Sequence, residues 1–104
     1  MIEKTYRLAQ SDEKLIEKVL LDENLHYLHM VLGAGESLPV HDTNGNVYMT
    51  VVRGRLSIAL GTQEAHEYEA GTLLKIPSRT RMDVQNAGET ALELIVVKAP
   101  APNI

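Results

Sequence analysis

From Asn24 onward the chain alternates apolar and polar residues with a period of two, and turn-forming residues interrupt this alternation at short intervals. Successive side chains of a strand point to opposite faces of a sheet, so a period of two is typical of half-buried β-strands. The pattern is clearest in LHYLHMVL (25–32), RLSIAL (55–60), TLLKI (72–76) and ALELIVVK (91–98). Many short strands separated by glycine, proline and asparagine predict an all-β antiparallel sandwich or barrel.

Two further elements are expected before the barrel. Lys4–Leu8 alternates in the same way and predicts a short edge strand. The segment SDEKLIEKVL (11–20) predicts a helix of about two to three turns, because its apolar residues fall on one helical face, Ser11 suits an N-cap and acidic residues fill the first turn. Within the barrel, Asn44 and Gly45 predict a two-residue hairpin turn, since both tolerate positive φ.

Composition narrows the possible functions. A chain of 104 residues suits one domain, and its apolar side chains are aliphatic, with no Phe or Trp and 4 Tyr to stack on sugars or bases. A net charge of −4 without a basic stripe argues against nucleic acid as a partner. The absence of cysteine excludes disulfides, thiolate metal sites and cysteine nucleophiles. We find no signal peptide or membrane-spanning stretch and expect a cytoplasmic protein without membrane partners.

The segment from Gly35 to Gly54 resembles the first motif of the cupin superfamily. That motif runs glycine, five residues, His-x-His, three or four residues, glutamate, six residues, glycine. At these places the chain has Gly35, His41, Thr43, Val47 and Gly54. The spacing is kept throughout, although one histidine and the glutamate are replaced.

A second segment resembles the second cupin motif at every spacing. Proline and asparagine are retained, whereas Arg79 replaces the middle glycine and Met82 replaces the histidine; the markers are Gly71, Pro77, Arg79, Met82 and Asn86. The resemblance covers about residues 25–98. It implies one small cupin domain over residues 1–104: a double-stranded β-helix (jelly-roll) barrel, preceded by the strand and short helix of residues 4–21.

The resemblance does not extend to the metal. Metal-binding cupins use three histidines and a glutamate from these motifs, and here only His41 fills such a place. Neither an alkyl group nor a neutral hydroxyl replaces imidazole or carboxylate, and a thioether is a weak ligand for the usual cupin metals. We therefore expect no cofactor and no metal at the usual site. His41 and His29 are the weak candidates for an atypical one; His26 and His29 point to opposite faces of one strand, so only one of them could join His41.

Alternation puts Val47, Met49 and Val51 on one face of their strand, and the cupin resemblance implies that this face looks into the barrel. The opposite segment should face inward through Met82 and Val84, with His41 and Thr43 near the mouth. The expected ligand pocket comprises His41, Thr43, Val47, Met49, Val51, Met82 and Val84. Its apolar side chains suit either a filled core or a small pocket with one polar corner. Arg79 and Arg81, close to the mouth, are an alternative anion site.

These features favour a metal-free cupin that binds or senses a small organic molecule. One alternative is a metal-independent enzyme of the isomerase or epimerase type, with His41 as the candidate catalytic acid or base. A metalloenzyme with atypical ligands and a purely structural role are further alternatives. We expect a homodimer, with Lys4–Leu8 as the candidate pairing strand.

Overall fold

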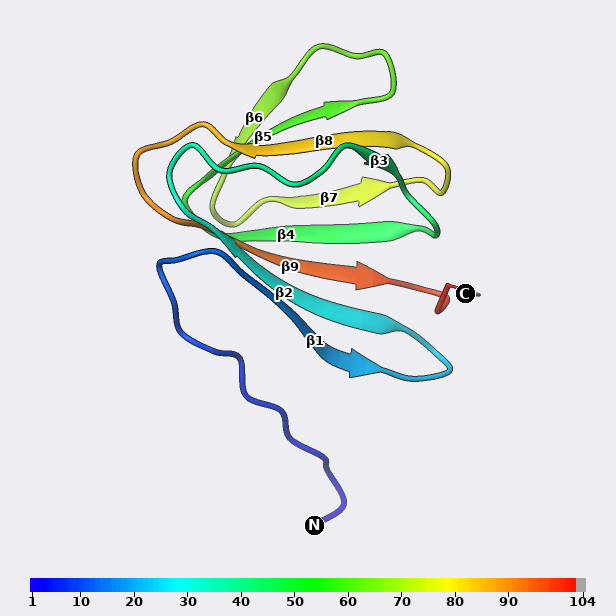
Figure 1. The fold of residues 1–104 in the computed structure, drawn as a ribbon. Coiled ribbons are helices and arrows are strands. Elements are labelled where there is room, and N and C mark those ends of the chain that lie inside the picture. Colours follow the sequence, from blue (N-terminus) through cyan, green and yellow to red (C-terminus); the bar gives the residue numbers. More distant parts are fainter. Residues whose placement is uncertain (103–104) are drawn as a thin grey trace.

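The computed structural model describes residues 1–102, which form two packed antiparallel β-sheets (Figure 1). Sheet A has five strands, in the spatial order β1 (Leu15–Leu21), β2 (His26–Leu32), β9 (Leu92–Lys98), β4 (Val47–Arg53) and β7 (Leu73–Ile76). Sheet B has four, in the order β3 (His41–Asp42), β8 (Arg81–Asn86), β5 (Arg55–Leu60) and β6 (His66–Glu69). The predicted all-β antiparallel architecture is confirmed. Residues 1–102 contain no helix long and apolar enough to cross a membrane.

The core lies between the facing sides of the two sheets. On β4 the buried residues are Val47, Met49 and Val51, so the inward face is the one that the alternation predicted. Met82 and Val84 on β8 are buried opposite them. The remaining large core residues are aliphatic as well: Leu28, Leu32, Leu38, Leu56, Ile58, Leu74, Ile76, Leu92, Leu94 and Val96.

The predicted helix over residues 11–20 is wrong, because its apolar half forms strand β1. Its apolar spacing also fits a strand that is shifted by one residue, and the β1–β2 pairing contains such a shift between Lys18 and Leu20. Pairing with β2 gives the backbone of this segment its hydrogen-bond partners. Tertiary pairing therefore overrides the local helical pattern.

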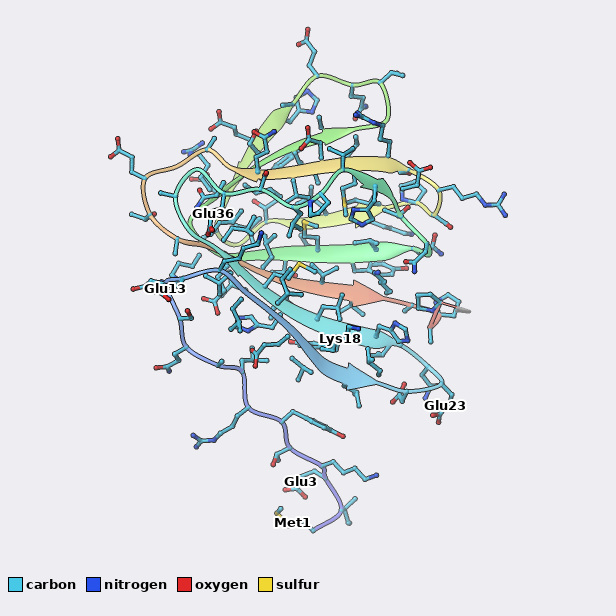
Figure 2. The ribbon with its side chains drawn as sticks, in the orientation of Figure 1. Met1, Glu3, Glu13, Lys18, Glu23 and Glu36 are labelled. Atoms are coloured by element: carbon cyan, nitrogen blue, oxygen red, sulfur yellow. The ribbon has the colours of Figure 1, made fainter. Side chains whose placement is uncertain are left out.

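The predicted edge strand at Lys4–Leu8 is also absent. Residues 1–8, here called the N-terminal arm, are exposed and belong to no strand. Figure 1 shows the arm running away from both sheets, and Met1 and Glu3 lie at its far end in Figure 2. Within a single copy, the arm has no neighbouring strand with which to pair.

The turn at Asn44 and Gly45 joins β3 of sheet B to β4 of sheet A, so the predicted hairpin is wrong. The proline-rich tail packs over the same end of the barrel. Its amides at Ala99 and Ala101 donate to the carbonyls of Asn46 (3.3 Å) and Asn24 (3.0 Å). Residues 103 and 104 of the tail lie outside the described part of the chain.

Four motif positions have a left-handed backbone: Gly35, Gly54, Gly71 and Arg79. Gly54 has φ = 84°, and a Cβ at this position would collide with the carbonyl oxygen of Ala91. Arg79, at the place of a motif glycine, has φ = 63° and is the one non-glycine residue with positive φ in residues 1–102. Its amide donates to the Thr43 carbonyl (2.9 Å), which fixes the turn beside the barrel mouth.

Candidate functional site

The two sheets enclose a cavity of about 30 Å³ at the end of the barrel where β3 and β4 are joined. The nine lining residues are Met30, Leu38, His41, Thr43, Val47, Met49, Met82, Val96 and Lys98. All four motif places that would hold a metal in a metal-binding cupin therefore converge on one cavity. A volume of this size holds about one water molecule or one methyl group.

The structure brings together five of the seven residues predicted to line a pocket. Val51 and Val84 are not among the lining residues, although both are buried in the core. They lie deeper between the sheets, where aliphatic side chains fill the space. The cavity also has a polar residue that sequence reasoning did not single out, Lys98 at the end of β9.

His41 lies on the rim of this cavity. It is exposed on the short strand β3, where it opposes Met82 of β8. Its Nδ1 is 2.9 Å from the carbonyl oxygen of Pro39, which only accepts, so Nδ1 carries the hydrogen. Within residues 1–102, Nε2 has no hydrogen-bond partner in the protein.

Thr43 occupies the place of a metal-binding histidine but uses its hydroxyl within the protein. The side chain is buried, and Oγ1 donates to the Pro77 carbonyl (2.8 Å) and accepts from the Thr80 amide (2.9 Å). The hydroxyl thus joins the start of the β3–β4 turn to the turn after β7. Both hydrogen bonds of the Thr43 hydroxyl are therefore made to backbone groups of the protein.

Comparison with known proteins agrees with this geometry. Residues 28–98 match a family described as the cupin domain. The chain belongs to the cupin family. This cupin is 36% identical over 103 residues to an uncharacterised protein of Methanocaldococcus jannaschii, covering 98% of the chain and 89% of the relative. The crystal structure of that protein, described as an RmlC-like cupin with a double-stranded β-helix fold, matches with a TM-score of 0.94 over 98% of this chain and 94% of the other.

More distant structures share the fold alone. An RmlC-like cupin from Desulfovibrio desulfuricans is 23% identical and has a TM-score of 0.75, covering 94% of this chain and 97% of the other. A Klebsiella pneumoniae protein with a double-stranded β-helix domain is 18% identical, with a TM-score of 0.79 and coverages of 92% and 84%. These matches confirm the jelly-roll barrel that the motif spacing predicted.

The residues of this cupin do not fit a divalent metal ion at the usual cupin site. The Thr43 hydroxyl is occupied by two backbone groups, Val47 offers only an alkyl group and Met82 offers a thioether. Among the described residues, no three His, Cys, Asp or Glu side chains are grouped so that they could hold an ion. One imidazole is an insufficient ligand set for zinc or the related ions.

The strand register determines whether His26 or His29 of β2 lies on the barrel side of sheet A, where His41 borders the cavity. His26 opposes Lys98, which in turn opposes Val47, and opposed residues share a face of the sheet. His26 therefore lies on the barrel side of sheet A. His29, three residues further along β2, lies on the outer face and cannot join His41 around one ion.

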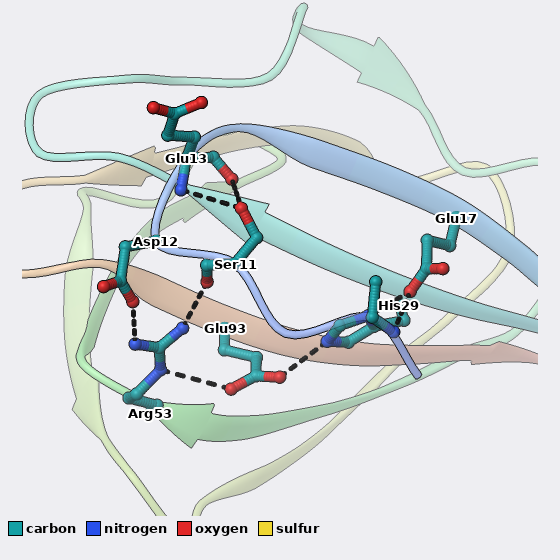
Figure 3. Close-up of polar contacts among 8 residues, drawn as sticks. Ser11, Asp12, Glu13, Glu17, His29, Arg53 and Glu93 are labelled. Atoms are coloured by element: carbon teal, nitrogen blue, oxygen red, sulfur yellow. Dashed lines mark hydrogen bonds and ion pairs between the residues drawn. The ribbon is translucent and has the colours of Figure 1, made fainter. Parts of the chain in front are cut away.

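On that outer face, His29 is held between two carboxylates (Figure 3). Its Nδ1 lies 2.6 Å from Glu17 Oε1 on β1, and its Nε2 lies 2.6 Å from Glu93 Oε2 on β9. The imidazole is fully buried. Burial disfavours the imidazolium, but the hydrogen bonds to Glu17 and then Glu93 outweigh it and raise the pKa of His29. The same contact lowers the pKa of Glu17.

Arg53 extends this network to the segment before β1. Its Nε donates to Glu93 (3.2 Å), and its two terminal nitrogens donate to Asp12 and to the Ser11 carbonyl (Figure 3). The Ala9 amide donates to the same Glu17 oxygen that binds the histidine. Sequence reasoning missed this network because it placed Glu17 on a helix, where the carboxylate would not oppose β2.

Proposed function

We propose that this cupin binds a small organic molecule at the mouth of its barrel without a bound metal ion. The observation that carries the proposal is the cavity itself, where the four motif places meet but offer one imidazole and otherwise apolar or internally bonded groups. An apolar cavity with one polar corner suits an organic ligand better than a cation.

A catalytic role has less support. A general acid or base is usually oriented by a neighbouring carboxylate or hydroxyl. Within residues 1–102, the one hydrogen-bond partner of the His41 side chain is the backbone carbonyl of Pro39. This arrangement supports binding at the rim and supplies no partner for a proton relay.

Thermal unfolding of chelator-treated protein tests the proposal with a panel of small organic acids, alcohols and amides, and separately with Zn²⁺, Ni²⁺ and Mn²⁺. A ligand that binds the folded state raises Tm. We expect organic compounds to raise Tm and the Val47→Ile variant, which adds a methylene to the cavity lining, to lose this effect. Val52→Ile, on the exposed side of the same strand, is the matched control. Stabilisation by metal ions and by none of the organic compounds would contradict the proposal.

Restoring the metal ligands tests the assignment of the motif places. The triple variant Thr43→His, Val47→Glu and Met82→His should bind Ni²⁺ or Zn²⁺ together with His41, because all four residues line one cavity. Calorimetric titration should show one ion per chain, and Thr43→His alone should show none. A folded triple variant without metal affinity would show that the places are wrongly assigned.

We further propose that the chain is a homodimer and that the N-terminal arm contacts the second copy. Ile2 is fully exposed, and Tyr6 is half exposed. The arm borders a shallow groove on the outer side of β1 and β2, lined by Lys4, Tyr6, Leu8, Val19, Leu20 and Tyr27. Light scattering at micromolar concentration should give a dimer that Tyr6→Ser weakens and Arg7→Ser leaves intact. A monomeric wild-type protein would refute the dimer.

A further inference from the structure

Lys98 is the one cationic residue among those that line the cavity. Its side chain is partly buried at the end of β9, between His26 of β2 and Val47 of β4. Within residues 1–102, no carboxylate lies within ion-pair distance of its ammonium group. Burial, together with the nearby charge of Lys18, lowers the pKa of Lys98. An ammonium group in such surroundings lacks the anion that would compensate its burial.

Two lysines lie near the mouth, although the chain is acidic overall. Lys18 lies on β1, on the same face of sheet A as Lys98, and is labelled in Figure 2. His26 opposes Lys98, and His41 lies on the opposite rim. In the β1–β2 turn, Asp22 accepts hydrogen bonds from the amides of Asn24 and Leu25. With a net charge of −4 for the whole chain, these two lysines are a local feature that favours an anion.

Below Lys98, the wall of the cavity is apolar and can change its shape. Met30, Met49 and Met82 line it, and the remaining methionine of the chain, Met1, lies at the end of the arm. Unbranched thioether side chains change rotamer at low cost and adjust to the shape of a ligand. A cavity of about 30 Å³ accepts the end of a short alkyl chain without major rearrangement.

We propose that the ligand of this site is a short-chain aliphatic carboxylate, whose carboxylate pairs with Lys98 and whose alkyl end enters between the three methionines. His41 lies on the opposite rim; its Nδ1 hydrogen is already donated to Pro39, so its Nε2 can donate to the carboxylate only in the imidazolium form. This inference rests on the proposed function and specifies the class of molecule that the mouth takes.

Titration with n-butyrate, followed by NMR of protein labelled at the methionine methyl groups, tests it. Met30, Met49 and Met82 should shift together and saturate in about the millimolar range expected for so small a ligand. Met1 should not shift, because it is fully exposed on the arm. Butyramide, which has nearly the same shape but no charge, should bind at least about tenfold more weakly, the difference expected for a charge-assisted hydrogen bond.

Two lysine variants separate the specific contact from the general charge. Lys98→Met should weaken butyrate binding at least about tenfold and leave butyramide binding unchanged. Lys75→Met removes an exposed lysine of β7 and should change neither. Equal affinities for butyrate and butyramide in the wild-type protein would overturn the carboxylate inference while leaving the proposed function standing. If neither compound moves the three methionine signals and no other organic compound raises Tm, both proposals fail.

Discussion

Replacing His29 by glutamine removes the imidazole that bridges Glu17 and Glu93. Both carboxylates accept hydrogen bonds and donate none, so each ring nitrogen must carry a hydrogen and the ring is an imidazolium. A glutamine amide has one donor nitrogen and one acceptor oxygen, so it cannot donate to both sides. The substitution therefore leaves a carboxylate next to an acceptor and removes the charge between the two acids.

The size of the effect follows from the burial of the three groups. Removing one partner of a buried charge pair costs about 3–5 kcal/mol. His29 is fully buried, but the side chains of Glu17 and Glu93 remain 26% and 19% exposed, so water can compensate part of the loss. We expect a destabilisation of about 2–3 kcal/mol, which corresponds to a fall in Tm of about 10–20 °C for a domain of this size.

The pH dependence of stability tests the His29 network more sharply than the loss of stability in the variant does. The raised pKa of His29 means that its stabilisation is complete below the unfolded-state value of 6.5 and disappears as pH rises through the folded-state pKa. The pKa of Glu17 is lowered from 4.5, so its contribution is present above that value and disappears as pH falls through its folded-state pKa. The network thus stabilises the protein most strongly between these two titrations.

Denaturant unfolding between pH 5 and pH 9 measures this window as the free energy of unfolding. The wild-type protein should lose stability above about pH 6.5, and His29→Gln should lose this part of the slope. His66→Gln, at an exposed histidine without an ion pair in residues 1–102, should follow the wild type. Identical slopes for the wild type and His29→Gln would refute the assignment of a buried imidazolium.

Other substitutions test the residues that shape the mouth. Thr43→Val should cost about 1–2 kcal/mol in denaturant unfolding, because the Thr80 amide loses its acceptor and the Pro77 carbonyl keeps only the Thr80 hydroxyl as a side-chain donor. Thr50→Val, at a threonine without a side-chain hydrogen bond in residues 1–102, should be nearly neutral. Arg79→Gly should raise stability by up to about 1 kcal/mol, since glycine relieves the left-handed backbone at some entropic cost; a clear loss would show a stabilising side-chain contact. Gly54→Ala should destabilise by more than about 2 kcal/mol through its positive φ and the collision with Ala91, and an unchanged Tm would contradict this geometry.

The sequence predicted the barrel well because its strands carry their own pattern. Alternation puts Val47, Met49 and Val51 on one face of β4, and the cupin resemblance identified that face as the inward one. The motif spacing also predicted that His41 and Met82 lie at one site. The pairing of β3 with β8, in which these two residues oppose each other, explains why they do. The strands can be predicted from the local sequence because each repeats the same two-residue alternation and turn-forming residues separate one strand from the next.

The first strand could not be predicted in the same way. Leu15, Ile16, Val19 and Leu20 fit one face of a helix as well as they fit a strand with a bulge, and only the neighbouring strand distinguishes the two. The His29 network was lost with that strand, because Glu17 opposes the histidine only in the register of β1 with β2. Likewise, Lys98 lines the cavity because of its place in the sheet, and a lysine at a strand end carries no local signal of this role.

The course of the C-terminal tail has a practical consequence for assays of this protein. Ala101 bonds to the β1–β2 turn, and Pro102 packs close to Gly45 in the turn that joins Thr43 to Val47. An affinity tag fused after residue 104 would follow Pro102 by two residues, within reach of the mouth, and would compete with added compounds for access. Polyhistidine fused there would also add imidazoles to a site whose four motif places hold one, and could imitate a native metal centre. Ligand and metal screens are best done with tag-free protein.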